Sequence, residues 1–252
     1  MIKEEYKIKL AEKKQISQGE EYFFVDIRGE EKKIGLHDYK TIYKYPWLYE
    51  AVVYDCLGCK TPDEMCNILD KLFSDLNIDR EKLHMLEIGA GSGIFASKLV
   101  ERVGIGDISG LDLYEVAKIA AERDRPNLYK NYYVADLTDL SPDLLKELTR
   151  QQFNCIGVAS ATGWGNHIPV GGFEQAFDLL IQGGLFIFHV KPFDPDPECI
   201  ALNRWIEHKI ESKQLILRHK QPAFHRYNME GDEIYYDVIV GVKNDSTESV
   251  EN

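Results

Sequence analysis

Five short apolar runs alternate with amphipathic stretches through the central part of the chain. The runs cover residues 83–88, 108–113, 132–135, 153–159 and 185–190, and each has the length of a buried strand. Stretches with helical periodicity lie between or after them, at 93–103, 114–124, 142–151 and 171–181. Regular alternation of strands and helices predicts a doubly wound α/β fold, in which helices cover both faces of a mainly parallel sheet.

The N-terminal part follows a different pattern. Residues 22–27 favour a β-strand, and the Arg28-Gly29 turn that follows predicts a hairpin. An aromatic-rich segment covers residues 37–54, and Thr61-Pro62 marks the start of a helix that runs to about residue 76. We therefore expect an N-terminal extension, a hairpin followed by an aromatic lid, over residues 1–60.

The C-terminal part predicts a further helix over residues 197–212 and then two β-rich runs. These runs, at 215–218 and 234–242, flank a polar connection and predict an antiparallel pair that closes the sheet. The last residues, 244–252, are polar and are expected to be disordered. The main domain is thus expected over residues 61–243.

The turn after the first predicted parallel strand carries the strongest chemical signal. Residues 87–93 read Glu-Ile-Gly-Ala-Gly-Ser-Gly, and glycines let a backbone approach a ligand closely. A dinucleotide fingerprint would need its third glycine at Ile94, and the Glu87 carboxylate would repel a phosphate. S-adenosylmethionine carries an ammonium and a sulfonium and no phosphate, so the charge of Glu87 favours that cofactor.

Two aspartates follow the next two predicted strands. Asp112, with Leu113 after it, lies 19 residues beyond Gly93. Its carboxylate can accept hydrogen bonds from both hydroxyls of a ribose. Asp136 is placed to meet an adenine amino group, with Leu137 packing on the ring. Ligands of open α/β sheets bind at the carboxyl ends of the strands, where these side chains converge.

In order and spacing, residues 87–93, Asp112 and Asp136 resemble the three cofactor motifs of class I S-adenosylmethionine-dependent methyltransferases. The resemblance covers roughly residues 80–192 and implies a seven-stranded sheet of order 3-2-1-4-5-7-6 with an antiparallel final hairpin. It implies that Asp112 binds ribose and that Asp136 with Leu137 binds adenine. The residues implied to line the methionine portion are Gly89, Ala90, Gly91 and Gly93.

A narrower resemblance extends to both sides of those motifs. Residues 37–39, 42–43, 46–50, 57–59 and 235–238 resemble functionally uncharacterised bacterial methyltransferases. The loop after the fourth strand resembles methyltransferase-like proteins of the Williams-Beuren type. Neither resemblance names a methyl acceptor.

The loop at residues 159–169 is expected beside the transferable methyl group. It lacks the Asn-Pro-Pro-Tyr type of motif, which argues against an amino nitrogen of a base or glutamine as acceptor. Ser160 is counted with the cofactor-binding residues. His167 is the candidate general base because histidine titrates near neutral pH, and its alternative is a structural hydrogen-bonding role.

Aromatic side chains supply the candidates for substrate or lid contact. Tyr43, Tyr49 and Trp164 could cover the cofactor or approach its sulfonium, and the alternative is packing in a core or lid. The pair His225-Arg226 is a further candidate for acceptor contact, with an exposed, solvated pair as the alternative.

The amino-acid composition limits the classes of binding partner that we expect. A formal net charge of -12 and a pI near 5.1 argue against nucleic acid or an anionic membrane and favour a small-molecule acceptor. No apolar run approaches the ~20 residues of a membrane span, and Met1–Glu5 lacks a secretory pattern, so a soluble, cytoplasmic protein is expected. Cys56, Cys59 and Cys66 lack a second CxxC pair, so no metal site is predicted.

The sequence thus predicts an S-adenosylmethionine-dependent methyltransferase that acts on a small-molecule acceptor and releases S-adenosylhomocysteine. Two alternatives remain open at this point. A nicotinamide-dependent oxidoreductase would share the fold and the ribose aspartate, although Glu87 and Ile94 argue against it. A non-catalytic protein that binds the same cofactor, or a partner, would share every cofactor residue. The oligomeric state is left open.

Overall fold

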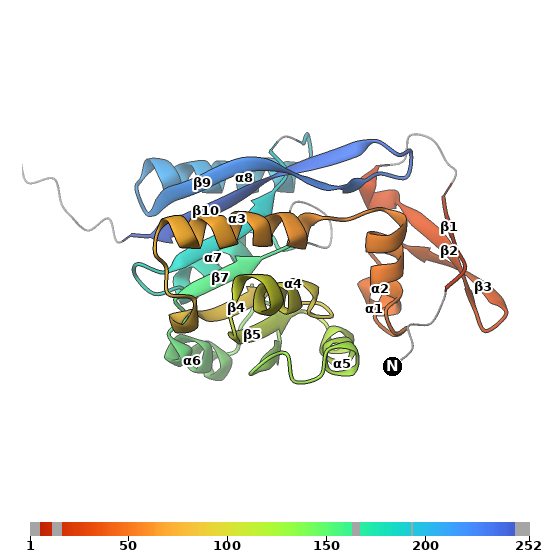
Figure 1. Ribbon diagram of the computed structural model, residues 1–252, viewed down its shortest axis with the longest axis horizontal. Helices are drawn as coiled ribbons and strands as arrows, with labels where there is room; N and C mark the ends of the chain where they lie inside the picture. Colours follow the sequence, from red (N-terminus) through yellow and green to blue (C-terminus); the bar gives the residue numbers. More distant parts are fainter. Residues whose placement is uncertain (1–5, 12–16, 163–166, 193, 245–252) are drawn as a thin grey trace, which may run out of the picture.

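The computed structural model describes residues 6–11, 17–162, 167–192 and 194–244. Its main sheet has seven strands in the order β6-β5-β4-β7-β8-β10-β9 (Figure 1). The strands are β4 (His84–Ile88), β5 (Asp107–Asp112), β6 (Tyr132–Val134), β7 (Cys155–Val158), β8 (Leu185–Val190), β9 (Leu215–Tyr227) and β10 (Glu233–Lys243). Strands β4 to β8 are mutually parallel, and β10 is antiparallel to both β8 and β9. The predicted sheet and strand order are confirmed.

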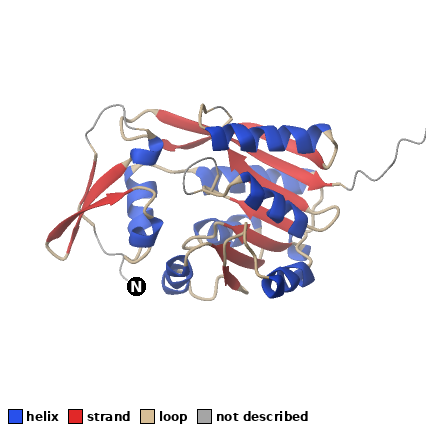
Figure 2. Cartoon of the chain, turned by 180° about the vertical axis from the view of Figure 1, so that it is seen from behind, coloured by secondary structure: helices blue, strands red, loops and turns tan. Residues whose placement is uncertain are grey.

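Helices cover both faces of this sheet, as Figures 1 and 2 show from opposite sides. One face packs against α3 (Thr61–Asp75) and α4 (Ile94–Lys98), which continues as a π-helical turn at Leu99–Val103. The other face packs against α6 (Pro142–Gln151), α7 (Val170–Leu179) and α8 (Pro197–Glu211). Helix α5 (Glu115–Asp124) lies beside β5 and β6, and a short 3-10 turn at Arg80–Lys82 precedes β4.

Side chains of each buried strand point alternately to the two faces of the sheet, so each strand packs against both helical layers. In β8, Phe186 and Phe188 belong to the cluster under α7 and α8, whereas Leu185 and Ile187 belong to the cluster under α3 and α4. Successive strand residues point to opposite faces, so a continuous apolar run is needed where both faces are covered. This is why the parallel strands were visible in the sequence as uninterrupted apolar runs.

A separate three-stranded sheet lies at the N-terminal end, at one side of the molecule in Figure 1. It contains β1 (Ile8–Leu10), β2 (Tyr22–Ile27) and β3 (Glu30–Gly35), with a 3-10 turn at Gln18–Glu20. The predicted hairpin is present, and Arg28 and Gly29 in its turn have φ values of 56° and 85°. The aromatic segment that follows forms α1 (Tyr39–Ile42), α2 (Leu48–Glu50) and a π-helical stretch, Ala51–Cys56.

The C-terminal hairpin is much longer than predicted. Residues 219–227, interpreted as part of a polar connection, continue β9 and pair with β10. The far end of β9 is hydrogen-bonded to the N-terminal part, where Lys60 N donates to His225 O (2.8 Å) and Tyr227 N donates to Leu57 O (2.9 Å). His225 and Arg226 are consequently buried, so their interpretation as an exposed, solvated pair was wrong.

Among the residues described, no helix combines the length and the apolar character that a bilayer crossing requires.

Candidate functional site

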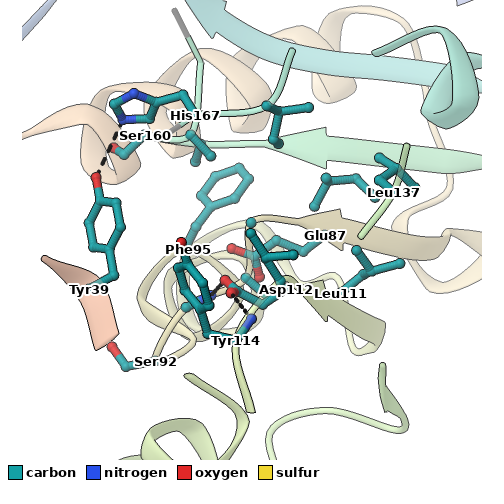
Figure 3. A pocket seen from close by; sticks show the side chains of 18 of the residues that line it. Tyr39, Glu87, Ser92, Phe95, Leu111, Asp112, Tyr114, Leu137, Ser160 and His167 are labelled. Atoms are coloured by element: carbon teal, nitrogen blue, oxygen red, sulfur yellow. Dashed lines mark hydrogen bonds between the residues drawn. The ribbon is translucent and has the colours of Figure 1, made fainter. Parts of the chain in front are cut away.

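A cavity with about 1010 Å³ of free space lies at the carboxyl ends of β4, β5, β6 and β7 (Figure 3). Strand ends that are far apart in sequence meet here because the strands are parallel. The cavity is lined by Glu87, Gly89, Ala90, Gly91, Asp112, Leu113, Asp136, Leu137, Ser160, His167, Tyr43 and Tyr49, all named from the sequence.

The glycine turn is shaped by close neighbours on both sides. Gly89 and Gly91 have φ values of 68° and 53°, a conformation that favours glycine. A Cβ on Gly89 would lie 2.5 Å from the Cβ of Ala161, and one on Gly91 would lie 2.4 Å from the hydroxyl of Tyr43. The turn therefore has no room for side chains at these two positions.

Gly93 is placed differently from the other predicted glycines. It has a φ of 87°, directly before α4, and it is not among the residues that line the cavity. A Cβ there would meet Leu128 at 2.7 Å and Tyr129 at 3.1 Å. Packing against Leu128 and Tyr129 thus explains why a glycine is needed at position 93, which the spacing of the motif did not reveal.

Glu87 is a buried carboxyl group near the end of β4. Tyr129 Oη donates a hydrogen bond to its Oε2 (2.7 Å). Burial raises the pKa of Glu87 to about 8, because the charged form loses its hydration, although the bond from Tyr129 acts in the opposite direction. The group is therefore poised to change its charge near neutral pH.

Asp112 ends β5, and backbone N–H groups fix both of its oxygens. Gly91 N donates to Oδ2 (2.9 Å), and Tyr114 N donates to Oδ1 (3.0 Å). Burial raises the pKa of Asp112, and these backbone bonds counteract it. A carboxylate offers about four lone-pair sites, so each oxygen can accept one further hydrogen bond.

Asp136 follows β6 and is exposed. Its Oδ1 accepts from Thr138 N (2.8 Å) and from Thr138 Oγ1 (2.6 Å), and these bonds lower the pKa of Asp136. Leu137 next to it is buried and presents an apolar surface to the cavity (Figure 3).

The charge of the cavity is one-sided. Glu87, Asp112 and Asp136 line it, and no lysine or arginine is among its described lining residues. A phosphate would meet acidic side chains and no basic one among the described lining residues, whereas a cationic ligand would be attracted and would favour the charged form of Glu87.

Four tyrosines of the N-terminal segment cover one side of the cavity. Tyr43 and Tyr49 were named from the sequence, and Tyr39 and Tyr54 were not. Neighbouring rings lie close, with centroids of Tyr43 and Tyr49 at 5.5 Å and of Tyr39 and Tyr43 at 6.1 Å. Only the tyrosine content of residues 37–54 could have signalled the other two. Trp164 lies outside the described residues.

The loop after β7 contributes Ser160 and His167. Tyr39 Oη lies 3.3 Å from His167 Nε2, as Figure 3 shows. Burial raises the pKa of Tyr39, so its phenol stays protonated at neutral pH. Ser160 has a φ of 56°, and its N–H donates to Nδ1 of His189 on β8 (3.2 Å).

A second, much smaller cavity adjoins the first. The two share the lining residues Tyr39, Tyr49, Ser160 and His167. Its other polar lining residues are Gln18, His37, Thr162, His189, His225, Arg226 and Tyr236. Of these, the sequence suggested His225 and Arg226 alone. In the part of the chain that is described, no group of three or more His, Cys, Asp or Glu residues is arranged to bind a metal.

Comparisons with known proteins identify the fold. No protein-family model matches the chain. The structure matches N-methyltransferase NodS from Bradyrhizobium japonicum WM9, crystallised with S-adenosylhomocysteine, with a TM-score of 0.56 over 82% of this chain and 97% of that chain. The fold is that of class I methyltransferases. PH1948 from Pyrococcus horikoshii, whose assignment as an RNA methyltransferase is provisional, has a TM-score of 0.53 over 75% of this chain and 86% of its own.

Sequence similarity to these proteins is low. The identities to NodS and PH1948 are 14% and 13%, so these structures establish the fold alone. Malonyl-[acyl-carrier protein] O-methyltransferase 2 from Ilyobacter polytropus is 25% identical over 159 residues, which are 56% of this chain. The match covers 58% of the length of that relative.

Proposed function

We propose that this chain is an S-adenosylmethionine-dependent methyltransferase that acts on a small-molecule acceptor and releases S-adenosylhomocysteine. The comparisons support the cofactor. The observation that carries the proposal is the acidic cavity itself, in which Asp112 and Glu87 flank a glycine turn at the ends of adjacent parallel strands. A cation with a nucleoside attached fits this combination better than a dinucleotide.

The residues present fit this cofactor. Glu87 and the turn at Gly89–Gly91 would bind its methionine portion, where side chains are excluded and a carboxyl group is buried. Asp112 would accept the two ribose hydroxyls with its remaining lone pairs, and Asp136 with Leu137 would contact the adenine. When bound, the cofactor supplies an electrophilic methyl group on a sulfonium.

The residues of the chain then have three tasks. The N-terminal tyrosines exclude water from the cavity, since they cover it with aromatic rings. Tyr39 orients the imidazole of His167 through its hydroxyl. His167 lines both cavities and accepts the proton that a hydroxyl acceptor loses as it is methylated.

The first experiment is calorimetric titration of the purified protein with S-adenosylmethionine and S-adenosylhomocysteine. Asp112→Ala removes two charge-assisted hydrogen bonds at about 1.5 kcal/mol or more each, so affinity should fall at least about 100-fold. Asp107→Asn is the matched control, because Asp107 begins the same strand at its opposite end and lines neither cavity. It should bind both ligands as the wild type does.

Each outcome separates the candidate functions. Micromolar binding of both adenosyl ligands, lost in Asp112→Ala alone, supports the cofactor site. Tight binding of NADH in place of them would overturn the proposal. Adenosyl binding without turnover on any acceptor would favour a non-catalytic binding protein.

A further inference from the structure

The second cavity contains a buried hydrogen-bond donor that has no partner among the described residues. Ser160 N–H donates to Nδ1 of His189, so Nδ1 is an acceptor. In a neutral imidazole the other nitrogen then carries the proton. Nε2 of His189 is therefore an N–H donor, and it makes no hydrogen bond within the described structure. The Oγ of Ser160, which lines the same cavity, is likewise buried and unpaired there.

The two unpaired atoms, Nε2 of His189 and Oγ of Ser160, indicate that a bound molecule forms hydrogen bonds with them. An unsatisfied buried polar group is disfavoured by about 1–3 kcal/mol, and most are paired in folded proteins. His189 is 1% exposed, so bulk water does not satisfy it. A ligand with an oxygen that accepts hydrogen bonds would satisfy both His189 and Ser160.

Three buried histidines and the arginine of this cavity present no net charge to such a ligand. Burial lowers the pKa of His37 and of His189 to about 3, and it lowers the pKa of His225 well below 6.5. All three imidazoles are thus neutral at pH 7. Arg226 is paired with Glu21 through two guanidinium nitrogens, and both residues are buried. An anionic ligand would find this cation already neutralised.

Flat rings form one side of the cavity. Tyr236 stacks on His225, with centroids at 4.6 Å and planes at 21°, and on His189, with centroids at 5.0 Å and planes at 27°. Planar ligands pack well beside such surfaces.

We propose that the second cavity is the inner end of the acceptor subsite. An uncharged, planar hydroxylated acceptor lies across the junction of the two cavities and places one oxygen in the second, where that oxygen accepts a hydrogen bond from His189 Nε2. This inference rests on the proposed function, because Ser160 and His167, which line both cavities, join it to the cofactor site. It names His189 as a residue that determines acceptor specificity.

The test compares two probes that differ in charge and little in shape. The protein is saturated with S-adenosylhomocysteine and titrated with 4-hydroxybenzamide or 4-hydroxybenzoate at pH 7.5, with ligand-observed NMR as the readout. The neutral amide should bind at least about 100-fold more tightly than the carboxylate, because burying an unpaired anion is costly.

Three variants test whether His189 Nε2 donates the hydrogen bond to the bound amide. His189→Asn keeps an acceptor for Ser160 N–H, but its shorter side chain has no donor at the position of Nε2, so amide affinity should fall at least about tenfold. His189→Gln places an amide N–H near the former Nε2 and should restore part of the affinity. His219→Asn is the matched control, since His219 lies on β9, lines neither cavity and also has an unpaired Nε2 within the described structure. It should bind the amide normally.

The proposal is overturned if neither probe binds, if the carboxylate binds as tightly as the amide, or if His189→Asn binds the amide normally. Binding of S-adenosylhomocysteine is measured in the same samples. Failure of that ligand to bind would contradict the cofactor site, whereas normal binding with no probe contact would contradict the acceptor subsite alone.

Discussion

Glu87 should couple cofactor binding to the release of a proton. With a pKa of about 8, the free carboxyl is protonated in roughly nine-tenths of molecules at pH 7. The ammonium group of the bound ligand would favour the charged form of Glu87. An opposite charge within about 4–6 Å lowers the pKa of a carboxyl group by about 1–3 units. A lowering of this size makes binding release about 0.4–0.9 proton at pH 7 and about 0.4–0.5 at pH 8.

The number of protons is measured directly by calorimetry. S-adenosylhomocysteine is titrated at pH 7 in buffers of different ionisation enthalpy, and the slope of binding enthalpy against buffer enthalpy gives the protons released. The amino group of the ligand also titrates, with a pKa near 8. Glu87→Gln keeps that contribution and keeps an acceptor for Tyr129, so the difference between wild type and variant isolates Glu87.

The expected difference is about 0.4–0.9 proton at pH 7. A slope that is the same in the wild type and in Glu87→Gln would refute the reasoning. It would mean either that Glu87 is already ionised in the free protein or that the ammonium binds elsewhere.

Two further predictions concern the histidines. His167→Ala should bind S-adenosylhomocysteine within about threefold of wild type and lose about 10²–10⁴-fold in turnover of a hydroxyl acceptor, and full turnover would contradict its role as base. The three neutral imidazoles of the second cavity, His37, His189 and His225, have pKa values lowered from 6.5, so the stability they contribute is full above pH 6.5 and declines as the pH falls toward 3. Unfolded histidine is already half protonated at pH 6.5, so each of the three costs about 1 kcal/mol of stability between pH 6.5 and 5.5. Glu87 acts in the opposite direction by about 1.3 kcal/mol, so urea unfolding should show a net loss of about 2 kcal/mol. Equal stability at the two pH values would contradict their burial as neutral groups.

The cofactor cavity was predictable because its signals are local. Residues 87–93 contain the strand end, the turn and the helix start in one stretch of sequence, and Asp112 and Asp136 follow their strands by the same rule. Each strand could be recognised from its own apolar run, and parallel strands necessarily bring their carboxyl ends together. No long-range contact had to be known.

The second cavity was not predictable for the opposite reason. Its polar residues include those at positions 37, 160, 189 and 225, which lie on four separate segments. The contact with His225 depends on the length of β9, and the polar run Arg218–Gln221 concealed that strand because an edge strand tolerates solvated side chains. In the sequence, His189 is a single polar residue within a buried apolar strand, and nothing marks it as a site residue. Only the three-dimensional contacts show that its Nε2 is unpaired among the described residues.

The charges of the two cavities make the proposals for His167 and for the acceptor depend on each other. Methylation of an uncharged hydroxyl releases a proton, which needs a destination, whereas methylation of a carboxylate releases none. His167 lines both cavities, so it lies where the acidic cavity meets the second one and can accept that proton. A neutral second cavity therefore requires a base at this junction, and an anionic acceptor would make the base unnecessary. If the carboxylate probe proved to be the better ligand, His167→Ala should be without effect on its methylation, and the two results together would replace the base mechanism with simple alignment of the reactants.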